Sequence, residues 1–168
     1  MNLSEKLILR EVTYRQNVLP ADRQDVRKMV ESSGFFSADE AEVAEELVAE
    51  RLSKGVSSGY FFLFAQWAER LIGYSCFGPI PCTKESYDLY WIAVQNDLRS
   101  SGIGKELLKR VEGIIHGTGG RRVYVETSSR KQYDPTRAFY EKSGYRQEAR
   151  LKDFYSPGDD KIIYLKLV

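Results

Sequence analysis

LYWIAVQNDLRSSGIGK, residues 89–105, is the stretch of sequence that decides the fold. Its apolar beginning predicts a buried strand, which we place at residues 87–94. A short polar turn with Arg99 follows, and Gly102 and Gly104 then open a helix. A helix that starts in this way points unpaired backbone N–H groups and the positive end of its dipole at one place. The stretch therefore predicts an anion site, and the anion that we expect is a phosphate.

The helix after the turn is marked by apolar residues at positions 103, 107, 111 and 114, which recur at helical spacing. Glycines at positions 117, 119 and 120 predict where it ends. Inside a helix, Gly102 and Gly104 would each destabilise the helix by about 1 kcal/mol relative to alanine. At the first turn they are explained if a ligand must approach the backbone closely.

Two familiar phosphate-binding motifs do not fit the turn. A P-loop requires a serine or threonine after its Gly-Lys pair, but Lys105 is followed by Glu106. A dinucleotide-binding fingerprint requires a third glycine, but position 107 is leucine. The pattern that remains is (Arg/Gln)-x-x-Gly-x-(Gly/Ala) after an Ala-Val pair, here RSSGIG at residues 99–104. This pattern resembles the acetyl-coenzyme A loop of the GNAT N-acetyltransferase superfamily.

A second motif supports the resemblance. The last helix of the family reads roughly Asn-x-x-Ala-x-x-(Phe/Leu)-Tyr-Glu-Lys-x-Gly-(Phe/Tyr), and YDPTRAFYEKSGY, residues 133–145, matches its C-terminal half. Pro135 suits a first helical turn and Gly144 suits a helix end. Tyr133 and Thr136 stand where the family usually has asparagine and alanine.

The resemblance covers nearly the full length and implies the GNAT fold. This is an α/β fold whose mixed, mostly antiparallel sheet of about seven strands is splayed at the centre, with about four helices on its faces. Strands are predicted at residues 6–14, 60–67, 71–78, 87–94, 122–127, 145–155 and 161–167. Helices are predicted at residues 21–31, from a capping box at 37–40 to position 52, after the turn, and at 133–144. Val43 and Leu52 are expected on the inner face of the second helix.

Length and composition narrow the class of protein. A chain of 168 residues is expected to form one domain, residues 1–168. Its 25 basic and 24 acidic side chains are interspersed, so neither nucleic acid nor a membrane surface is an expected partner. With no long apolar segment, we expect a cytoplasmic protein. Cys76 and Cys82 are too few and too close together for a disulfide framework or a zinc site, and no metal is expected.

The resemblance implies acetyl-CoA as the cofactor and coenzyme A as the product. It also implies the residues that hold the coenzyme, in three groups. The backbone of a strand bulge is expected to pair with the pantetheine arm, and the turn is expected to hold the phosphates. The last helix is expected to complete the coenzyme site. These groups are Ile92, Ala93 and Val94; Arg99, Ser100, Ser101, Gly102, Ile103, Gly104 and Lys105; and Tyr133, Thr136, Phe139, Tyr140 and Lys142.

Acetyl transfer to an amine also requires that protons move. Tyr140 is the usual donor to the departing thiolate in the family, and its alternative role is packing in the helix core. An alkyl ammonium of pKa ~10.4 must lose a proton to a base. We favour Asp88, a lone acid at the start of an apolar strand, over Glu126 on the next strand. The alternative for both is a solvated charge at a strand end.

The acceptor is the least defined part of the prediction. The resemblance implies that the acceptor pocket is formed by the first two helices and the last hairpin. The candidate acceptor-binding residues there are Phe35, Phe36, Phe154 and Tyr155. Nearby acidic residues suit a small cationic amine or an amino-acid derivative, and also a lysine or a peptide N-terminus. We favour a small-molecule amine, with a monomer or a homodimer as the assembly. The alternatives are a coenzyme-binding sensor with little turnover and a protein or peptide N-acetyltransferase.

Overall fold

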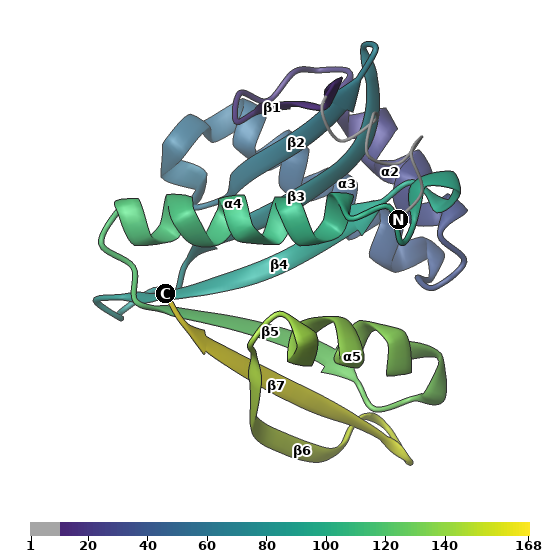
Figure 1. Ribbon diagram of the computed structural model, residues 1–168, viewed down its shortest axis with the longest axis vertical. Coiled ribbons are helices and arrows are strands. Elements are labelled where there is room, and N and C mark those ends of the chain that lie inside the picture. Colours follow the sequence, from purple (N-terminus) through teal and green to yellow (C-terminus); the bar gives the residue numbers. More distant parts are fainter. Residues whose placement is uncertain (1–10) are drawn as a thin grey trace. The chain divides into compact units, whose positions relative to one another are not determined.

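The computed structural model describes residues 11–168, and its elements follow the predicted order (Figure 1). The strands are β1 (Thr13–Arg15), β2 (Phe61–Trp67), β3 (Arg70–Pro79), β4 (Ser86–Val94), β5 (Arg122–Ser128), β6 (Arg146–Ser156) and β7 (Asp159–Leu167). The α-helices of this part of the chain are α2 (Asp22–Ser32), α3 (Ala38–Lys54), α4 (Ile103–Gly117) and α5 (Asp134–Lys142). The sheet has seven strands in the order β1-β2-β3-β4-β5-β7-β6. The predicted class of fold is therefore confirmed for residues 11–168.

Three predicted details differ from the structure. The first strand was expected at residues 6–14, but β1 is Thr13–Arg15, and positions 6–10 lie outside the described residues. The last hairpin is tighter than expected, because Ser156 pairs with Asp159 and leaves a two-residue turn. Val43 and Leu52 are 46% and 37% exposed. The buried stripe of α3 runs instead through positions 41, 44 and 48, which share one face of the helix.

The capping box of α3 is present as predicted. The Ser37 hydroxyl accepts a hydrogen bond from the Glu40 N–H, and the Glu40 carboxylate accepts one from the Ser37 N–H. These two bonds satisfy donors that a helix start leaves unpaired, so this sequence signal fixes where α3 begins.

The chain divides into two compact units. Among the described residues, the first contains 11–78 together with 91–111, and the second contains 79–90 together with 112–168. The expectation of a single domain stays a prediction. Among the helices of the described part, none is long and apolar enough to cross a membrane.

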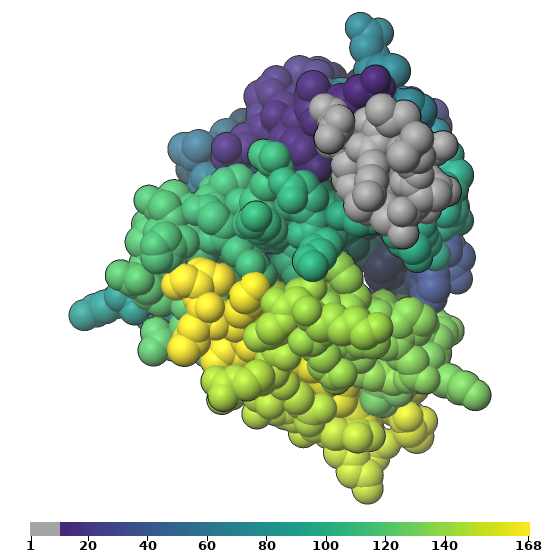
Figure 2. All heavy atoms as spheres, in the orientation of Figure 1, coloured from purple at the N-terminus to yellow at the C-terminus, as the bar shows by residue number. Residues whose placement is uncertain are grey.

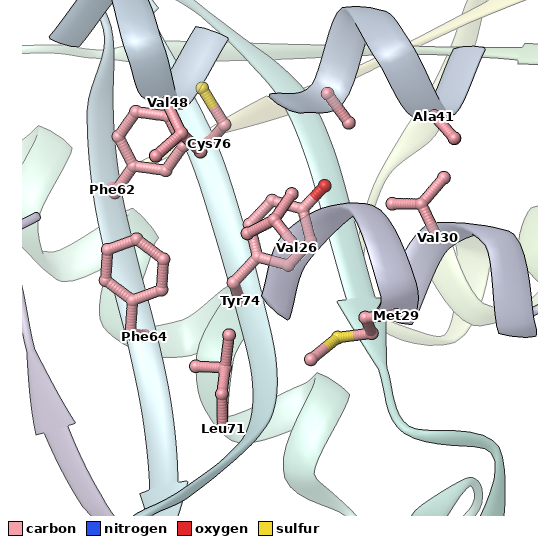
Figure 3. Packing of buried hydrophobic residues seen from close by; sticks show 11 residues of the cluster. Val26, Met29, Val30, Ala41, Val48, Phe62, Phe64, Leu71, Tyr74 and Cys76 are labelled. Carbon is pink, nitrogen blue, oxygen red and sulfur yellow. The ribbon is translucent and has the colours of Figure 1, made fainter. Parts of the chain in front are cut away.

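The core of the first unit lies between α2, α3 and the strands β2 and β3 (Figure 3). Val26, Met29 and Val30 of α2 belong to the same buried cluster as the rings of Phe62, Phe64 and Tyr74. On the other face of β3, a Cβ added to Gly73 would lie 3.0 Å from Leu107 of α4. The glycine therefore lets the first half of α4 pack closely against the strand.

The second unit is built around β5, which pairs in parallel with β4 and antiparallel with β7. One face of these strands carries Val125 and Tyr164, and Tyr140 of α5 packs against that face. The other face carries Tyr124, Glu126 and other partly exposed side chains. The edge strand β6 is exposed along nearly its whole length, and with α5 it forms yellow-green surface in Figure 2.

Candidate functional site

The turn before α4 is fixed by bonds within itself. Ser100 and Gly102 have φ values of +64° and +94°. The Ser101 hydroxyl donates to the Leu98 carbonyl oxygen at 2.6 Å, and Ser101 is buried. The Glu106 N–H donates to the Gly102 carbonyl oxygen at 3.0 Å, which is the first bond of the helix. The N–H groups just before Glu106 have no acceptor within α4, because a helix start supplies none.

The turn therefore leaves backbone N–H groups available at the start of α4, and its binding of a phosphate stays a prediction. Its donors are the N–H groups of Ile103, Gly104 and Lys105, and the positive end of the α4 dipole adds to them. The exposed Lys105 and Arg99 bring positive charge to the same segment. An anion held by such donors is bound through the backbone, so a side chain added at a glycine would stand in its way.

Arg99 contacts a residue that was predicted to line the acceptor pocket. Its guanidinium carbon lies 4.7 Å from the centre of the Phe35 ring. Partial burial lowers the pKa of Arg99, but an arginine remains charged at neutral pH. The Asn96 amide also donates to the Ser32 carbonyl oxygen. Within the first unit, the loop between α2 and α3 is thus held against the turn.

Phe36 packs against the strand that leads into the turn. Its ring centroid lies 4.8 Å from that of Trp91 on β4. Both residues border the hydrophobic core of the first unit, as does Ala93. Trp91 and Ala93 are two positions apart and share a face of β4. Phe36 therefore has a packing role, and its contact with an acceptor stays a prediction.

Tyr140 is a buried member of an aromatic cluster in the second unit. Its ring centroid lies 5.5 Å from that of Tyr145 and 6.2 Å from that of Tyr164. Burial raises the pKa of Tyr140 well above its ordinary value, so the phenol holds its proton throughout the neutral range. Tyr140 therefore packs in the aromatic cluster, as its alternative role required. Its role as proton donor stays a prediction.

The N-terminal end of α5 carries the departures from the family pattern. Tyr133 is buried at the N-cap, and the Arg130 guanidinium carbon lies 5.5 Å from its ring centre. Thr136 and Phe139 are half-buried, whereas Lys142 is exposed. A contact of these residues with a coenzyme stays a prediction.

Both candidate bases lie on one face of the second unit. Asp88 is paired with Tyr124 across β4 and β5, and Glu126 follows two positions later on β5. Because strand side chains alternate between faces, the two carboxylates point to the same side. Burial raises the pKa of Asp88 to about 6, with repulsion from Glu126 as the second cause, while Lys161 acts in the opposite direction.

Lys161 completes this face, and sequence reasoning missed it. Its Nζ lies 2.7 Å from Oε2 of Glu126 and 3.7 Å from the centre of the Phe154 ring. The sequence signal was slight, a lysine that opens an apolar strand. Phe154, predicted to bind an acceptor, thus has a ring face against the chain's own ammonium. Tyr155 packs edge-on against Phe154 with centroids 5.1 Å apart.

Neither cysteine takes part in these clusters. Cys76 is buried in the core of the first unit, and burial raises the pKa of its thiol. Cys82 is exposed. Over residues 11–168, no group of three or more His, Cys, Asp or Glu side chains is arranged to hold a metal ion.

Comparison with known proteins identifies a family and several similar structures. A model of the acetyltransferase (GNAT) family matches residues 24–145. A crystal structure of a GNAT-family protein from Desulfovibrio desulfuricans is 50% identical, with a TM-score of 0.92 over 93% of this chain and 98% of that one. A GNAT family acetyltransferase from Elizabethkingia anophelis with acetyl-CoA bound is 18% identical, with a TM-score of 0.67 over 94% and 99% of the two chains. At that identity, the likeness concerns the fold alone.

A curated relative is the uncharacterized N-acetyltransferase MJ1530 of Methanocaldococcus jannaschii. It is 32% identical over 75 residues, which are 45% of this chain and 47% of the relative. The chain therefore matches about half the length of that relative.

Proposed function

This chain belongs to the acetyltransferase (GNAT) family, and from that premise we propose that it transfers an acetyl group from acetyl-CoA to a primary amine. The observation that carries the proposal is the turn before α4. Two positive φ values, at Ser100 and Gly102, shape it, and the first N–H groups of the helix have no acceptor within α4. Such a turn suits the pyrophosphate of a coenzyme.

The residues present fit acetyl-CoA as the group to be bound. The N–H groups of Ile103, Gly104 and Lys105 would hold the pyrophosphate, and Arg99 would add a charged donor. The backbone of β4 at residues 92–94 would pair with the pantetheine arm. When bound, the coenzyme supplies an activated acetyl group as a thioester. A relative of the same fold, from Elizabethkingia anophelis, carries acetyl-CoA in its structure, which supports the proposal.

Two side chains of the second unit carry out the proton transfers. Asp88 takes a proton from the acceptor ammonium, directly or through a water molecule, so that the neutral amine is available for attack. A base whose pKa is about 6 is ionised at pH 7 and better matched to that pH than an ordinary aspartate. Tyr140, which keeps its proton at neutral pH, gives it to the departing sulfur.

We take a small amine as the acceptor, and a coenzyme-binding sensor is the second candidate. The sensor is favoured by one observation: the buried Tyr133 stands where the family usually has asparagine. A sensor would bind acetyl-CoA through the same turn but would turn over slowly or not at all. A peptide N-acetyltransferase would use the same chemistry on a larger acceptor.

A thiol-release assay combined with calorimetry separates these functions. The protein is titrated with acetyl-CoA and is then assayed with small diamines, amino-acid amides, a lysine peptide and a peptide with a free N-terminus. We expect coenzyme binding and thiol release that depends on a small amine. Tight binding without turnover on any acceptor would favour the sensor, and turnover on peptides alone would favour the peptide enzyme. Absence of coenzyme binding would overturn the proposal.

A further inference from the structure

Three charged side chains from three neighbouring strands share one face of the second unit. Asp88 lies on β4, Glu126 on β5 and Lys161 on β7. Lys161 is the register partner of Ser128, two positions beyond Glu126. The three side chains therefore follow a diagonal across the strands, within the distance at which long side chains on neighbouring strands interact.

The ammonium of Lys161 is held from two sides. Its Nζ lies 2.7 Å from Oε2 of Glu126, and the Phe154 ring centre lies 3.7 Å from it. The Lys161 side chain is only 14% exposed, whereas the Glu126 side chain is 47% exposed. A charge so far removed from water needs a partner of opposite sign, and Glu126 provides it. An aromatic face stabilises a cation further.

The pairing makes the two carboxylates unequal. One carboxylate oxygen of Glu126 is held directly by the Lys161 ammonium, at 2.7 Å. The field of Lys161 reaches Asp88 only as a smaller effect, after burial and repulsion from Glu126. Two neighbouring acids that lie in such different surroundings take different roles in proton transfer.

We propose that Lys161 is a positioning residue, which by pairing with Glu126 keeps that carboxylate out of proton transfer and leaves Asp88 to take the proton of the acceptor. The role of Asp88 as the base rests on the proposed function, whereas the effect of Lys161 on Glu126 and Asp88 does not. Glu126 and Lys161 are the charged groups that act on Asp88 from β5 and β7. On β6, Arg150 is paired with Asp160, and Asp153 accepts a hydrogen bond from the Gly158 N–H.

The test is a carbon-13 NMR titration of the Asp88 carboxyl in the free protein, which needs neither coenzyme nor amine. In Lys161→Met, two uncompensated carboxylates share the face, so we expect the Asp88 midpoint to rise by about half a pH unit or more. Lys161→Arg should restore it, because the charge returns. Lys152→Met removes a lysine from exposed β6 and should leave the midpoint unchanged.

Glu126→Gln is the second variant, and it keeps the proposal open to test if Lys161→Met fails to fold. It removes the repulsion and frees Lys161 to turn toward Asp88, so the Asp88 midpoint should fall. Equal midpoints in wild type, Lys161→Met and Glu126→Gln would overturn the role of Lys161.

A kinetic readout then tests the assignment to Asp88 separately. The acidic limb of the kcat/KM profile should move in the same direction as the NMR midpoint in each variant. A moved NMR midpoint with an unmoved limb would overturn Asp88 as the base. Absence of turnover in the wild type would instead contradict the proposed function and would leave the titration result intact.

Discussion

The turn before α4 and the charged face of the second unit are built in opposite ways. The turn is local, since one short segment supplies its bonds and its positive φ values. Its donors are backbone groups. The charged face joins Asp88, Glu126 and Lys161 from three strands, and its groups are side chains. The difference separates a site that depends on backbone shape from one that depends on charge.

This contrast leads to distinct expectations for the two regions. A backbone cradle should be sensitive to an added Cβ, and changes in it should appear in coenzyme affinity. A cluster of ionisable side chains should be sensitive to pH and to the loss of a charge, and changes in it should appear in the rate. Variants that mix these effects would break the comparison.

The largest effect is expected from Tyr140→Phe. The ring keeps its packing against Tyr145 and Tyr164, but the proton for the departing sulfur is lost. The maximal rate should fall ~10²-fold or more, with acetyl-CoA affinity unchanged. Steady-state kinetics and calorimetry measure the two quantities. Tyr145→Phe, which also removes a buried hydroxyl, is the matched control and should keep its rate. Equal losses of rate and affinity in Tyr140→Phe would point to packing instead.

Asp88→Asn should lower kcat/KM by about 10²-fold at pH 7, with the loss shrinking as pH rises toward 9. The physical reason is that the acceptor amine loses its proton unaided at high pH and then needs no base. A profile of kcat/KM against pH checks this. A profile parallel to that of the wild type would remove Asp88 from the role and leave Glu126 or water.

The same variant has a readout that does not depend on activity. The folded state raises the pKa of Asp88 from its ordinary 3.8 to about 6, so its ionised form is disfavoured by folding. The ionised Asp88 therefore lowers the stability of the folded state in full above pH 6. This destabilisation disappears below about pH 4, where the carboxyl is protonated in the folded and the unfolded state. Asp88→Asn should therefore raise the melting temperature at pH 8, and the gain should vanish at low pH.

Gly102→Val should weaken acetyl-CoA binding by at least ~10-fold, which corresponds to about 1.4 kcal/mol. Valine at a φ of +94° also strains the backbone, so a control is needed. Gly119 has a φ of +91° and nothing within 4 Å of an added Cβ. Gly119→Val should cost similar stability while leaving the calorimetric affinity unchanged. Equal affinity in both variants would place the coenzyme elsewhere.

The smallest effect concerns Phe35, an aromatic residue that packs against the turn. Phe35→Leu removes the ring beneath Arg99 and should weaken coenzyme binding about threefold, since such a contact is worth about 0.5–1 kcal/mol at an exposed site. Phe61→Leu is matched, because Arg51 lies 4.9 Å from that ring. It should leave affinity unchanged. A tenfold loss in Phe35→Leu would mean that the turn depends on side chains as much as on its backbone.

The order of helices and strands was readable from the sequence because its signals are local. The capping box at Ser37, the glycines around α4 and the apolar runs of β2 and β3 are each signals that act within a few residues. The same is true of the turn, whose shape follows from the residues between Asn96 and Glu106. Helix ends and hairpin turns were less exact, as the last hairpin shows, because pairing across strands decides where a turn begins.

The role of Lys161 was not readable, since no local pattern reports which side chains meet across β5 and β7. Its partners depend on a register that brings Ser128 opposite Lys161 and so sets Glu126 beside it. The same holds for the contact of Phe154 with Lys161, whereas the predicted contact of Phe154 with an acceptor stays a prediction. A lone charge in an apolar strand is the only hint that such positions give, and it does not name a partner.

The most direct test of the account is a nitrogen-15 NMR titration of the backbone amides with acetyl-CoA. The amides of Gly102, Ile103, Gly104 and Lys105 should shift strongly, because they begin to donate to the pyrophosphate. Gly113, on the exposed face of α4, is the internal control and should shift little. Pantetheine, which lacks the pyrophosphate, should leave the turn amides unshifted. Binding of acetyl-CoA without a shift at these amides would contradict the central claim that this turn holds the coenzyme.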